Sequence, residues 1–544
     1  MAGADALGVR TAVPTPVVAP LRALDWRFLL PVPPDTRFRR LALLGAPRGL
    51  PELADRAGLA SEVVTTVTSG AADVVAAWVG SPASIAEIAA SVAADGVLYL
   101  QVDRAAGVRV TRPSIIEGVL RDAGLHPSAI YALEPDANDP RAYIALDTAR
   151  AMNWHRLTAL GPHQSIRLAN VVRQSAVRLG GASLAAWDRP FAIVAVRGDP
   201  AGARAPGVLS DTEVLSILGR SSEPRGAVMI TYGGDRVLFF PFFGDEAQPA
   251  AVVKLPKSPP LIGRTENEQA QMRTLRDSLD SALGASVPRP LGIRRWATTV
   301  AACEQYRPGM SLAARASDER LPIAERGSDL SRAMDWLIRF HLATERHRST
   351  IATEWSTIIE RPLDAYRRSM GLAADDALSQ AVRDAGDALG DVELATVTAH
   401  RDLAAWNVIR DGDALAVVDW EGAREGHGAL DALHLATTWL YAVRSAAGTP
   451  DELRCVLDLI DTNRAGDLAS TVARDAISRY AAAVRLDRRA VPLLMVLHRV
   501  ELAVRRNEQH RLQATSAEAP ENDDARIVRA LGSRAGTLLP KRPS

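Results

Sequence analysis

Cysteine is scarce in this chain, which has only Cys303 and Cys455 in 544 residues. Two cysteines cannot build a disulfide framework or a cysteine-based zinc cluster, so both classes of protein are excluded. Lysine is also rare: Lys254, Lys257 and Lys541 are the only lysines, and arginine supplies the other Lys+Arg side chains. A lysine inside an apolar stretch is therefore a candidate for a specific role.

The chain also lacks excess charge and long hydrophobic runs. Its 64 basic and 64 acidic residues give a net charge of zero, which argues against a general nucleic-acid binder. No uninterrupted apolar run approaches the roughly 18 residues that a membrane span needs. The first residues, "MAGADALGVRTAVPTPVVAP", do not resemble a signal peptide. We therefore expect a cytoplasmic protein without a membrane span.

The length predicts several domains. Residues 1–24 are expected to be a flexible arm. Over residues 25–197, strand-like runs such as "RRLALLGAP", "EVVTTV" and "DGVLYLQVD" alternate with helical runs such as "SIAEIAASVA". This alternation predicts an α/β domain with a Rossmann-like parallel sheet. The Gly/Pro/Ala-rich stretch "GDPAGARAPG", residues 198–207, is the expected linker.

The pattern changes after the linker. Closely spaced β-like runs, "EVLSILG", "GAVMITY", "RVLFFPFF" and "AAVVKL", predict an antiparallel sheet within residues 208–310. Residues 311–515 are mostly helical in pattern, and residues 516–544 form a polar tail. We therefore expect an α+β unit of two lobes to follow the α/β domain.

Candidate chemistry concentrates in "VTAHRDLAAWNVIRDGDALAVVDWEG", residues 397–422. "NVIR" and "LAVVDW" are apolar runs joined by the turn "DGD", which predicts a hairpin. This hairpin would bring Asn407 and Asp419 together, with Asp402 nearby. Two carboxylates and an amide suit Mg²⁺ but are too few to enclose it, so the pattern indicates a site that also receives phosphates. The alternative is that these residues only terminate turns and strands.

This segment resembles the catalytic loop H-R-D-x4-N and the metal-binding aspartate of the protein-kinase-like superfamily. The second motif is Asp419-Trp420-Glu421, and "GAREGHGALDALHL" follows it with no Ala-Pro-Glu segment. That pattern is similar to the aminoglycoside phosphotransferase and choline kinase branch, which phosphorylates small molecules. Arg401 is a departure, since the branch usually has glycine there.

Upstream segments resemble the other parts of such a site. Lys254 ends the strand-like "AAVVK", as in the Val-Ala-Ile-Lys pattern, and Lys257 is the alternative assignment. The expected partner is Glu268 rather than Glu266, because Glu268 begins an inward-facing helical spacing in "TENEQAQMRTL".

Two further segments resemble weaker parts of the family pattern. "VAACEQYRPGMSL" resembles the hinge between lobes, where backbone groups from Glu304 to Tyr306 would hold adenine. "LSILGRSSEPRGAVMIT" places Gly219 and Ser221 between two expected strands, as candidates for the loop that covers the phosphates. An ordinary hairpin loop is the alternative for that segment.

The resemblance implies an ATP- and Mg²⁺-dependent phosphotransferase that acts on a hydroxyl of a small molecule or sugar. Asp402 would orient the hydroxyl, Asn407 and Asp419 would hold Mg²⁺, and Lys254 would bind the α- and β-phosphates. The alternatives are a regulatory pseudokinase, a protein kinase, and a methyltransferase with a kinase-like accessory domain.

The region from about residue 25 to 195 resembles a degenerate class I methyltransferase domain, with a strand, a glycine turn and a helix at its start. The turn reads "GAPRG", where Pro47 removes an N–H, and the strand "SEVVTTVTSG" lacks the acidic residue that would bind a ribose. These departures argue against S-adenosylmethionine binding. A scaffold, a substrate-presenting module or a dimerisation domain is the expected role.

Overall fold

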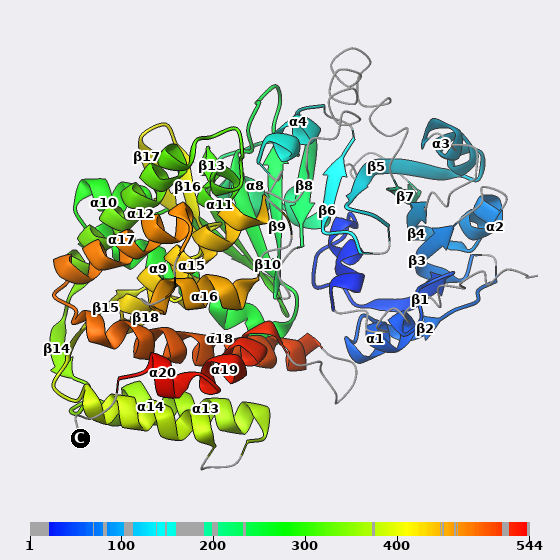
Figure 1. The fold of residues 1–544 in the computed structure, drawn as a ribbon. Coiled ribbons are helices and arrows are strands. Elements are labelled where there is room, and N and C mark those ends of the chain that lie inside the picture. Colours follow the sequence, from blue (N-terminus) through cyan, green and yellow to red (C-terminus); the bar gives the residue numbers. More distant parts are fainter. Residues whose placement is uncertain are drawn as a thin grey trace, which may run out of the picture.

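The computed structural model describes most of the chain, and Figure 1 shows its fold. The described residues are 21–68, 70–79, 84–102, 113–137, 139–146, 149–158, 190–198, 205–231, 235–372, 376–446, 448, 451–461, 464, 466–513 and 522–540. Most of the expected arm, residues 1–20, lies outside them. Residues 21–24 belong to the 3-10 helix η1 (Leu21–Leu29).

The N-terminal part begins as a parallel sheet. Strand β1 pairs in parallel with β2 and β3, and β3 pairs in parallel with β4. The strands and their connecting helices are β1 (Phe38–Leu44), α1 (Leu50–Arg56), β2 (Ala60–Val64), β3 (Ala72–Val79), α2 (Ile85–Ala90) and β4 (Val92–Val102). The inner strands are almost entirely apolar because both faces of the sheet are covered.

The next strands make the sheet mixed, so the expected all-parallel Rossmann-like sheet is not what forms. Strand β7 is antiparallel to β4 and β5, and β6 is antiparallel to β5. A short connection between β5 and β6 permits this, since antiparallel neighbours need only a turn. The elements are α3 (Pro113–Asp122), β5 (Leu125–Glu134), β6 (Ala142–Ala145), α4 (Ala149–Thr158) and β7 (Phe191–Arg197).

One sheet runs through both halves of the expected domain division. Strand β6 pairs with β8, giving twelve strands in the order β11-β12-β10-β9-β8-β6-β5-β7-β4-β3-β1-β2. The elements after the expected linker are α7 (Gly207–Ser210), α8 (Thr212–Ile217), β8 (Gly226–Ile230), β9 (Arg236–Phe242), β10 (Ala251–Pro256), η5 (Pro259–Leu261), α9 (Ile262–Ser278), α10 (Ser281–Ser286), β11 (Pro290–Arg295) and β12 (Val300–Gln305). Backbone pairing therefore connects the N-terminal part directly to the following lobe (Figure 1).

The β-like run "EVLSILG" is helix α8, which corrects the expectation of a strand there. Asp211 caps this helix, because its side chain accepts hydrogen bonds from the backbone N–H groups of Glu213 and Val214. An N-cap of this kind satisfies otherwise unpaired N–H groups and favours the helix over the strand suggested by composition.

The second lobe is mainly helical and ends in helices that pack onto it. Its helices are α11 (Leu312–Ala316), α12 (Ile323–Thr344), the π-helix η6 (Ser356–Glu360), α13 (Arg361–Met370), α14 (Ala377–Ala388), η7 (Trp420–Gly422), α15 (Ala429–Ser445), α16 (Glu452–Ile460), α17 (Leu468–Ala483), η8 (Arg488–Ala490), α18 (Val491–Gln513), α19 (Asp523–Gly532) and α20 (Ala535–Leu538). The expected polar tail contains α19 and α20, which pack against α18 and α14.

Two small sheets sit among these helices. They are β13-β16-β17 and β14-β15-β18, with bounds β13 (Met310–Ser311), β14 (His347–Thr350), β15 (Glu393–Ala399), β16 (Val408–Asp411), β17 (Ala414–Val417) and β18 (Arg424–His427). Strands β16 and β17 form the predicted hairpin.

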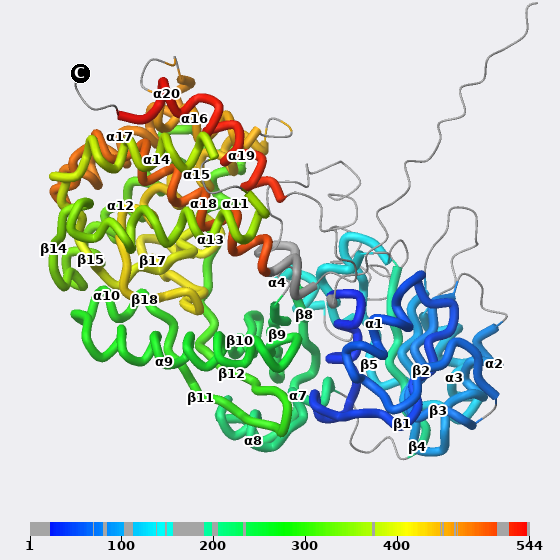
Figure 2. The backbone as a smooth tube through the Cα atoms, turned by 90° about the horizontal axis from the view of Figure 1, so that it is seen from below, coloured from blue at the N-terminus to red at the C-terminus, as the bar shows by residue number. Residues whose placement is uncertain are grey.

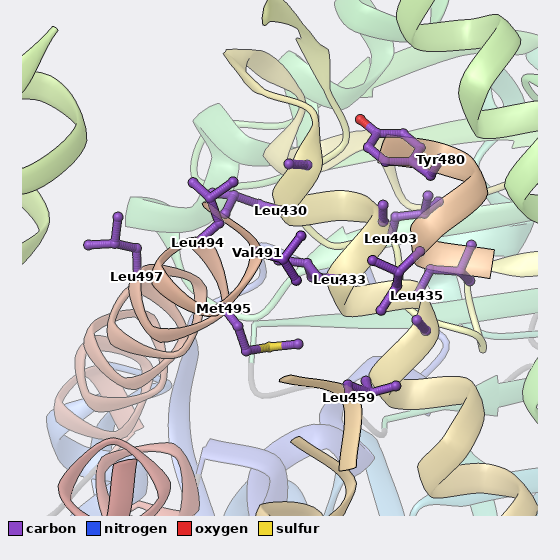
Figure 3. Close-up of a cluster of buried hydrophobic side chains, with 14 of the residues drawn as sticks. Leu403, Leu430, Leu433, Leu435, Leu459, Tyr480, Val491, Leu494, Met495 and Leu497 are labelled. Carbon is purple, nitrogen blue, oxygen red and sulfur yellow. The ribbon is translucent and has the colours of Figure 1, made fainter. Parts of the chain in front are cut away.

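A single apolar core holds this lobe together. Figure 3 shows part of it, where Leu433, Leu435, Val491 and Met495 belong to one cluster between α15 and α18. Figure 2 shows the helical lobe and the N-terminal part at opposite ends of the molecule, with β8 to β12 between them. Among the described residues, no helix has the length and apolar character to cross a membrane.

Candidate active site

Lys254 lies on β10 in a buried cluster of charges. Its Nζ is 2.6 Å from Oε1 of Glu268 on α9 and 2.9 Å from Oε2 of Glu304 on β12. The nearby carboxylates offset the burial cost, and the pKa of Lys254 rises to about 12. The structure therefore brings Lys254 together with Glu268, the expected partner. Glu304 joins them through its side chain, whereas the sequence pattern suggested only a role for its backbone.

Lys257, the alternative lysine, lies elsewhere. Its Nζ is 2.6 Å from Oδ2 of Asp25 in η1, and both side chains are fully buried. Arg27 also donates a hydrogen bond to the carbonyl of Lys257 at 2.7 Å. Lys257 therefore fastens the N-terminal part to the end of β10 and leaves Lys254 as the candidate for phosphate binding.

Arg236, at the start of β9, links the lysine cluster to the hairpin. Its guanidinium is 2.8 Å from Oε2 of Glu268 and 3.2 Å from Oε2 of Glu421, and it also donates to Oδ1 of Asp419. The backbone N–H of Trp420 donates to Oε1 of Glu268 at 3.1 Å. No sequence pattern pointed to Arg236, because a single charged residue at the start of an apolar strand is common.

The catalytic-loop segment is held by Asp431 of α15. Its carboxylate accepts from the backbone N–H of His400 at 2.6 Å and of Arg401 at 2.8 Å. Arg401 has φ +70°, a left-handed conformation that costs little for glycine and about 1–2 kcal/mol for other residues. This geometry explains why glycine suits the position, and the Arg401 guanidinium adds an ion pair to Glu501 at 2.6 Å.

Asp402 faces two basic groups. Nη2 of Arg505, on α18, is 2.8 Å from its Oδ1, and Nε2 of His434 is 3.5 Å from the same atom. Although burial alone would raise its pKa, Arg505 and His434 hold the pKa of Asp402 well below its usual range. Asp402 is therefore a carboxylate at neutral pH. Arg505 lies 103 positions away in the sequence, and no local pattern pointed to it.

Asn407 and Asp419 lie at the two ends of the hairpin, as predicted. The backbone N–H of Val418 donates to the carbonyl of Asn407 at 2.9 Å, and Nδ2 of Asn407 donates to the carbonyl of Asp402 at 2.8 Å. Asp419 has φ +73°, and the neighbouring Arg236 lowers its pKa against the effect of burial. The hairpin therefore places an amide and a carboxylate beside Asp402.

The expected hinge adjoins a helix of the N-terminal part. Nε1 of Trp154, on α4, donates to the hydroxyl of Tyr306 at 2.8 Å, and the ring centroids of Trp154 and Phe240 are 4.6 Å apart. Lys254 pairs with Leu238, so Leu238 and Phe240 lie on the same face of the sheet as Lys254. Trp154 therefore packs on the face that carries the phosphate-binding candidate, which the sequence did not indicate.

Gly219 and Ser221 are not brought to this cluster. They follow helix α8 and precede β8, at the end where Gly226 pairs with Phe242. Lys254 lies opposite Leu238, which pairs with Ile230 at the other end of β8. Strands β8 and β9, the first two strands of this lobe, are joined by residues 231–235. Residues 232–234 of this connection lie outside the described residues.

The family comparison agrees with these motifs. Residues 242–454 match the model of the phosphotransferase enzyme family. This stretch contains Lys254, Glu268, Asp402, Asn407 and Asp419. The family match does not extend to the N-terminal part, whose methyltransferase-like character stays a prediction.

Solved structures of small-molecule kinases are also similar to the chain. Glucosamine kinase in complex with glucosamine, ADP and inorganic phosphate is 18% identical, covers 60% of this chain and 86% of its own, and has a TM-score of 0.37. Amicoumacin kinase hAmiN, in complex with AMP-PNP, Ca²⁺ and Ami, is 13% identical over 58% and 90%, with a TM-score of 0.35. An aminoglycoside phosphotransferase from Streptomyces rimosus is 16% identical over 49% and 90%, with a TM-score of 0.32. A search of the curated proteins found no match.

The donor set in the phosphotransferase-family region fits Mg²⁺ when phosphates complete its coordination. The described residues hold no group of three or more His, Cys, Asp and Glu side chains that could bind a metal by itself. Asn407 and Asp419 offer hard oxygen donors, and Mg²⁺ typically takes one or two carboxylates with phosphates and waters. The arrangement therefore suits a metal that arrives with a nucleotide.

Proposed function

We propose that this chain transfers the γ-phosphate of ATP to a hydroxyl of a small molecule or sugar. The observation that carries the proposal is the connected cluster in which Glu268 contacts Lys254, Arg236 and the N–H of Trp420. This cluster ties the phosphate-binding lysine on β10 to the hairpin that presents Asp419. These contacts hold residues of the two lobes in fixed relative positions. Such positioning matters because it is the main requirement of phosphoryl transfer.

Each side chain has a role in this proposal. Lys254 would neutralise the α- and β-phosphates, and Asn407 with Asp419 would hold Mg²⁺, which supplies charge neutralisation at the transferring phosphoryl group. Asp402 would accept a hydrogen bond from the acceptor hydroxyl and orient it. Because Arg505 keeps Asp402 ionised, its function is orientation of the hydroxyl, with proton uptake only as the phosphoryl group is transferred.

Arg236 would change partners when the nucleotide binds. It balances Asp419 and Glu421 in the structure, where those carboxylates would otherwise repel each other. If Asp419 held Mg²⁺, Arg236 would no longer be needed to balance its charge, and the guanidinium could face phosphate oxygens, which it can bind with two parallel hydrogen bonds.

The N-terminal part acts as a scaffold in this proposal. Residues 25–197 would form this domain, 198–207 a connection, 208–310 the first lobe and 311–515 the second. The Asp25–Lys257 pair and the Trp154–Tyr306 hydrogen bond both reach from the scaffold to the first lobe. Both cysteines are free and buried, which fits a reducing, cytoplasmic location.

Ligand-dependent stability tests the metal-nucleotide site. Thermal unfolding is measured with and without ATP and Mg²⁺ for the wild type, Asp419→Ala and the control Asp413→Ala, whose side chain is 89% exposed in the same hairpin. ATP at about one hundred times its Kd should stabilise the wild type and the control by about 2.7 kcal/mol, only when Mg²⁺ is present. Equal stabilisation of Asp419→Ala would contradict the assignment, and no response from any variant would favour a pseudokinase that does not bind nucleotide.

A further inference from the structure

A large cavity opens beside the catalytic-loop segment. Its volume is about 530 Å³, and its walls come from η6, α13, η7, β18 and α18. Arg401 and Arg505 line it, and Arg505 contacts Asp402 directly. Arg505 therefore connects the wall of this cavity to Asp402.

Arginine dominates the charged wall. Five arginines line the cavity: Arg264, Arg361, Arg401, Arg424 and Arg505. Arg361 and Arg424 are exposed, and neither forms a hydrogen bond or ion pair through its side chain with any residue that the structure describes. Partial burial lowers the pKa of Arg424, the guanidiniums of Arg401 and Arg505 lower it further, and Glu501 acts in the opposite direction. These three cations are therefore close enough to repel one another.

Three of the four acidic residues of the wall lie near basic side chains. Glu501 is 2.6 Å from Arg401, Glu421 is 3.2 Å from Arg236, and Glu425 is 3.9 Å from Arg346. Glu508 is the exposed exception on α18. Arg236 and Arg346 lie outside the lining, whereas Arg361 and Arg424 line the cavity without a side-chain partner among the described residues.

The remaining wall is apolar. Leu430, Leu494 and Leu497 contribute side chains from α15 and α18, and Figure 3 shows them at the edge of the core cluster. Ile358 and Pro362 line the cavity from η6 and α13. The cavity thus combines a hydrophobic surface with unbalanced guanidinium groups.

We infer that the acceptor carries an anionic group, a phosphate or a carboxylate, which Arg361 and Arg424 bind while its hydroxyl reaches Asp402. This inference rests on the proposed function and names the substrate class for it. A guanidinium matches the geometry of a carboxylate or phosphate with two parallel hydrogen bonds, and the cost of grouping unpaired arginines is offset when an anion binds. The two anion types differ in charge, so paired acceptors distinguish them.

The first test is anion binding by protein saturated with Mg²⁺ and AMP-PNP, which fills the nucleotide site. Sulfate is titrated at constant ionic strength, and the melting temperature is compared among wild type, Arg361→Gln, Arg424→Gln and the control Arg320→Gln. Arg320 is 75% exposed, and its one ion pair with a described residue is to its neighbour Asp318. Each cavity variant should weaken the apparent sulfate affinity about tenfold, the loss expected for one charge-assisted contact, and the control should match the wild type. Sulfate curves that coincide for all four proteins would overturn the inference.

The second test is turnover of matched acceptors. Phosphate transfer from ATP is compared for glucose, glucosamine, gluconate and glucose 1-phosphate. The anionic pair should have a kcat/KM at least about tenfold above the neutral and cationic pair, and Arg424→Gln should remove the difference through KM. A preference for glucose or glucosamine would refute the inference.

The two tests also separate this inference from the proposed function. Sulfate binding that depends on Arg361 and Arg424, without any stabilisation by the nucleotide, would refute the phosphotransferase and keep the anion site. Stabilisation by nucleotide with no dependence of sulfate binding on these arginines would refute only the anionic acceptor.

Discussion

Replacing Lys257 by methionine should strongly destabilise the protein, although Lys257 lies outside the candidate active site. Lys257 and Asp25 are 2.6 Å apart with fully buried side chains. Burial raises the pKa of Asp25 and lowers that of Lys257, so for both groups the loss of water outweighs the attraction of the partner. Burying the Asp25–Lys257 pair therefore costs free energy, but removing one partner and leaving the other charge buried costs more.

The magnitude follows from what the single variant leaves behind. In Lys257→Met, the Asp25 carboxylate keeps Arg27, whose nearest nitrogen is 3.8 Å away, and a weaker attraction from Arg22. Removing one partner of a buried pair typically costs about 3–5 kcal/mol. The double variant Asp25→Leu with Lys257→Met buries no charge and should recover most of the loss, since apolar replacements of whole buried pairs are often neutral or stabilising.

The assay is urea denaturation followed by tryptophan fluorescence, with free energies from linear extrapolation. The surface variant Arg320→Gln is the control and should stay within about 0.5 kcal/mol of the wild type. A loss below about 1 kcal/mol in Lys257→Met would show that water reaches the pair and would refute the reasoning. Failure of the double variant to recover would show that the lysine stem, not its charge, carries the stability.

Three further results are expected. Trp154→Ala should weaken ATP binding up to about tenfold, because Tyr306 loses its hydrogen bond and Phe240 its ring contact; isothermal titration with unchanged affinity would contradict a role for α4. Arg505→Ala should raise the pKa of Asp402 and so shift the acidic limb of the pH–kcat profile to higher pH, while a profile that only scales down would indicate a structural role. Burial raises the pKa of Glu304 to about 7 from 4.5, so the folded state binds the extra proton in this interval and the free energy of unfolding should fall as pH rises through it. Glu304→Gln should flatten that slope in urea denaturation at several pH values, and an unchanged slope would assign the pH dependence to another group.

The sequence by itself determined the parts of the site that are local. The hairpin of β16 and β17, with Asn407 and Asp419 at its ends, follows from two short apolar runs and a turn. Glu268 was selected because helical periodicity turns it inward, and its side chain is 1% exposed. The Lys254–Glu268 pair spans only 14 positions, so strand and helix patterns sufficed to find it.

Only the tertiary structure decided which distant residues complete the site. Arg236 reaches Asp419 across 183 positions, and Trp154 reaches Tyr306 across 152. Their positions depend on how β9 and α4 pack, and periodicity within one element carries no information on its neighbours in space. The same reason explains the single sheet through both halves of the chain. The pairing of β6 with β8 depends on long-range packing, whereas the Gly/Pro-rich stretch between β7 and α7 signals only a local interruption of regular structure.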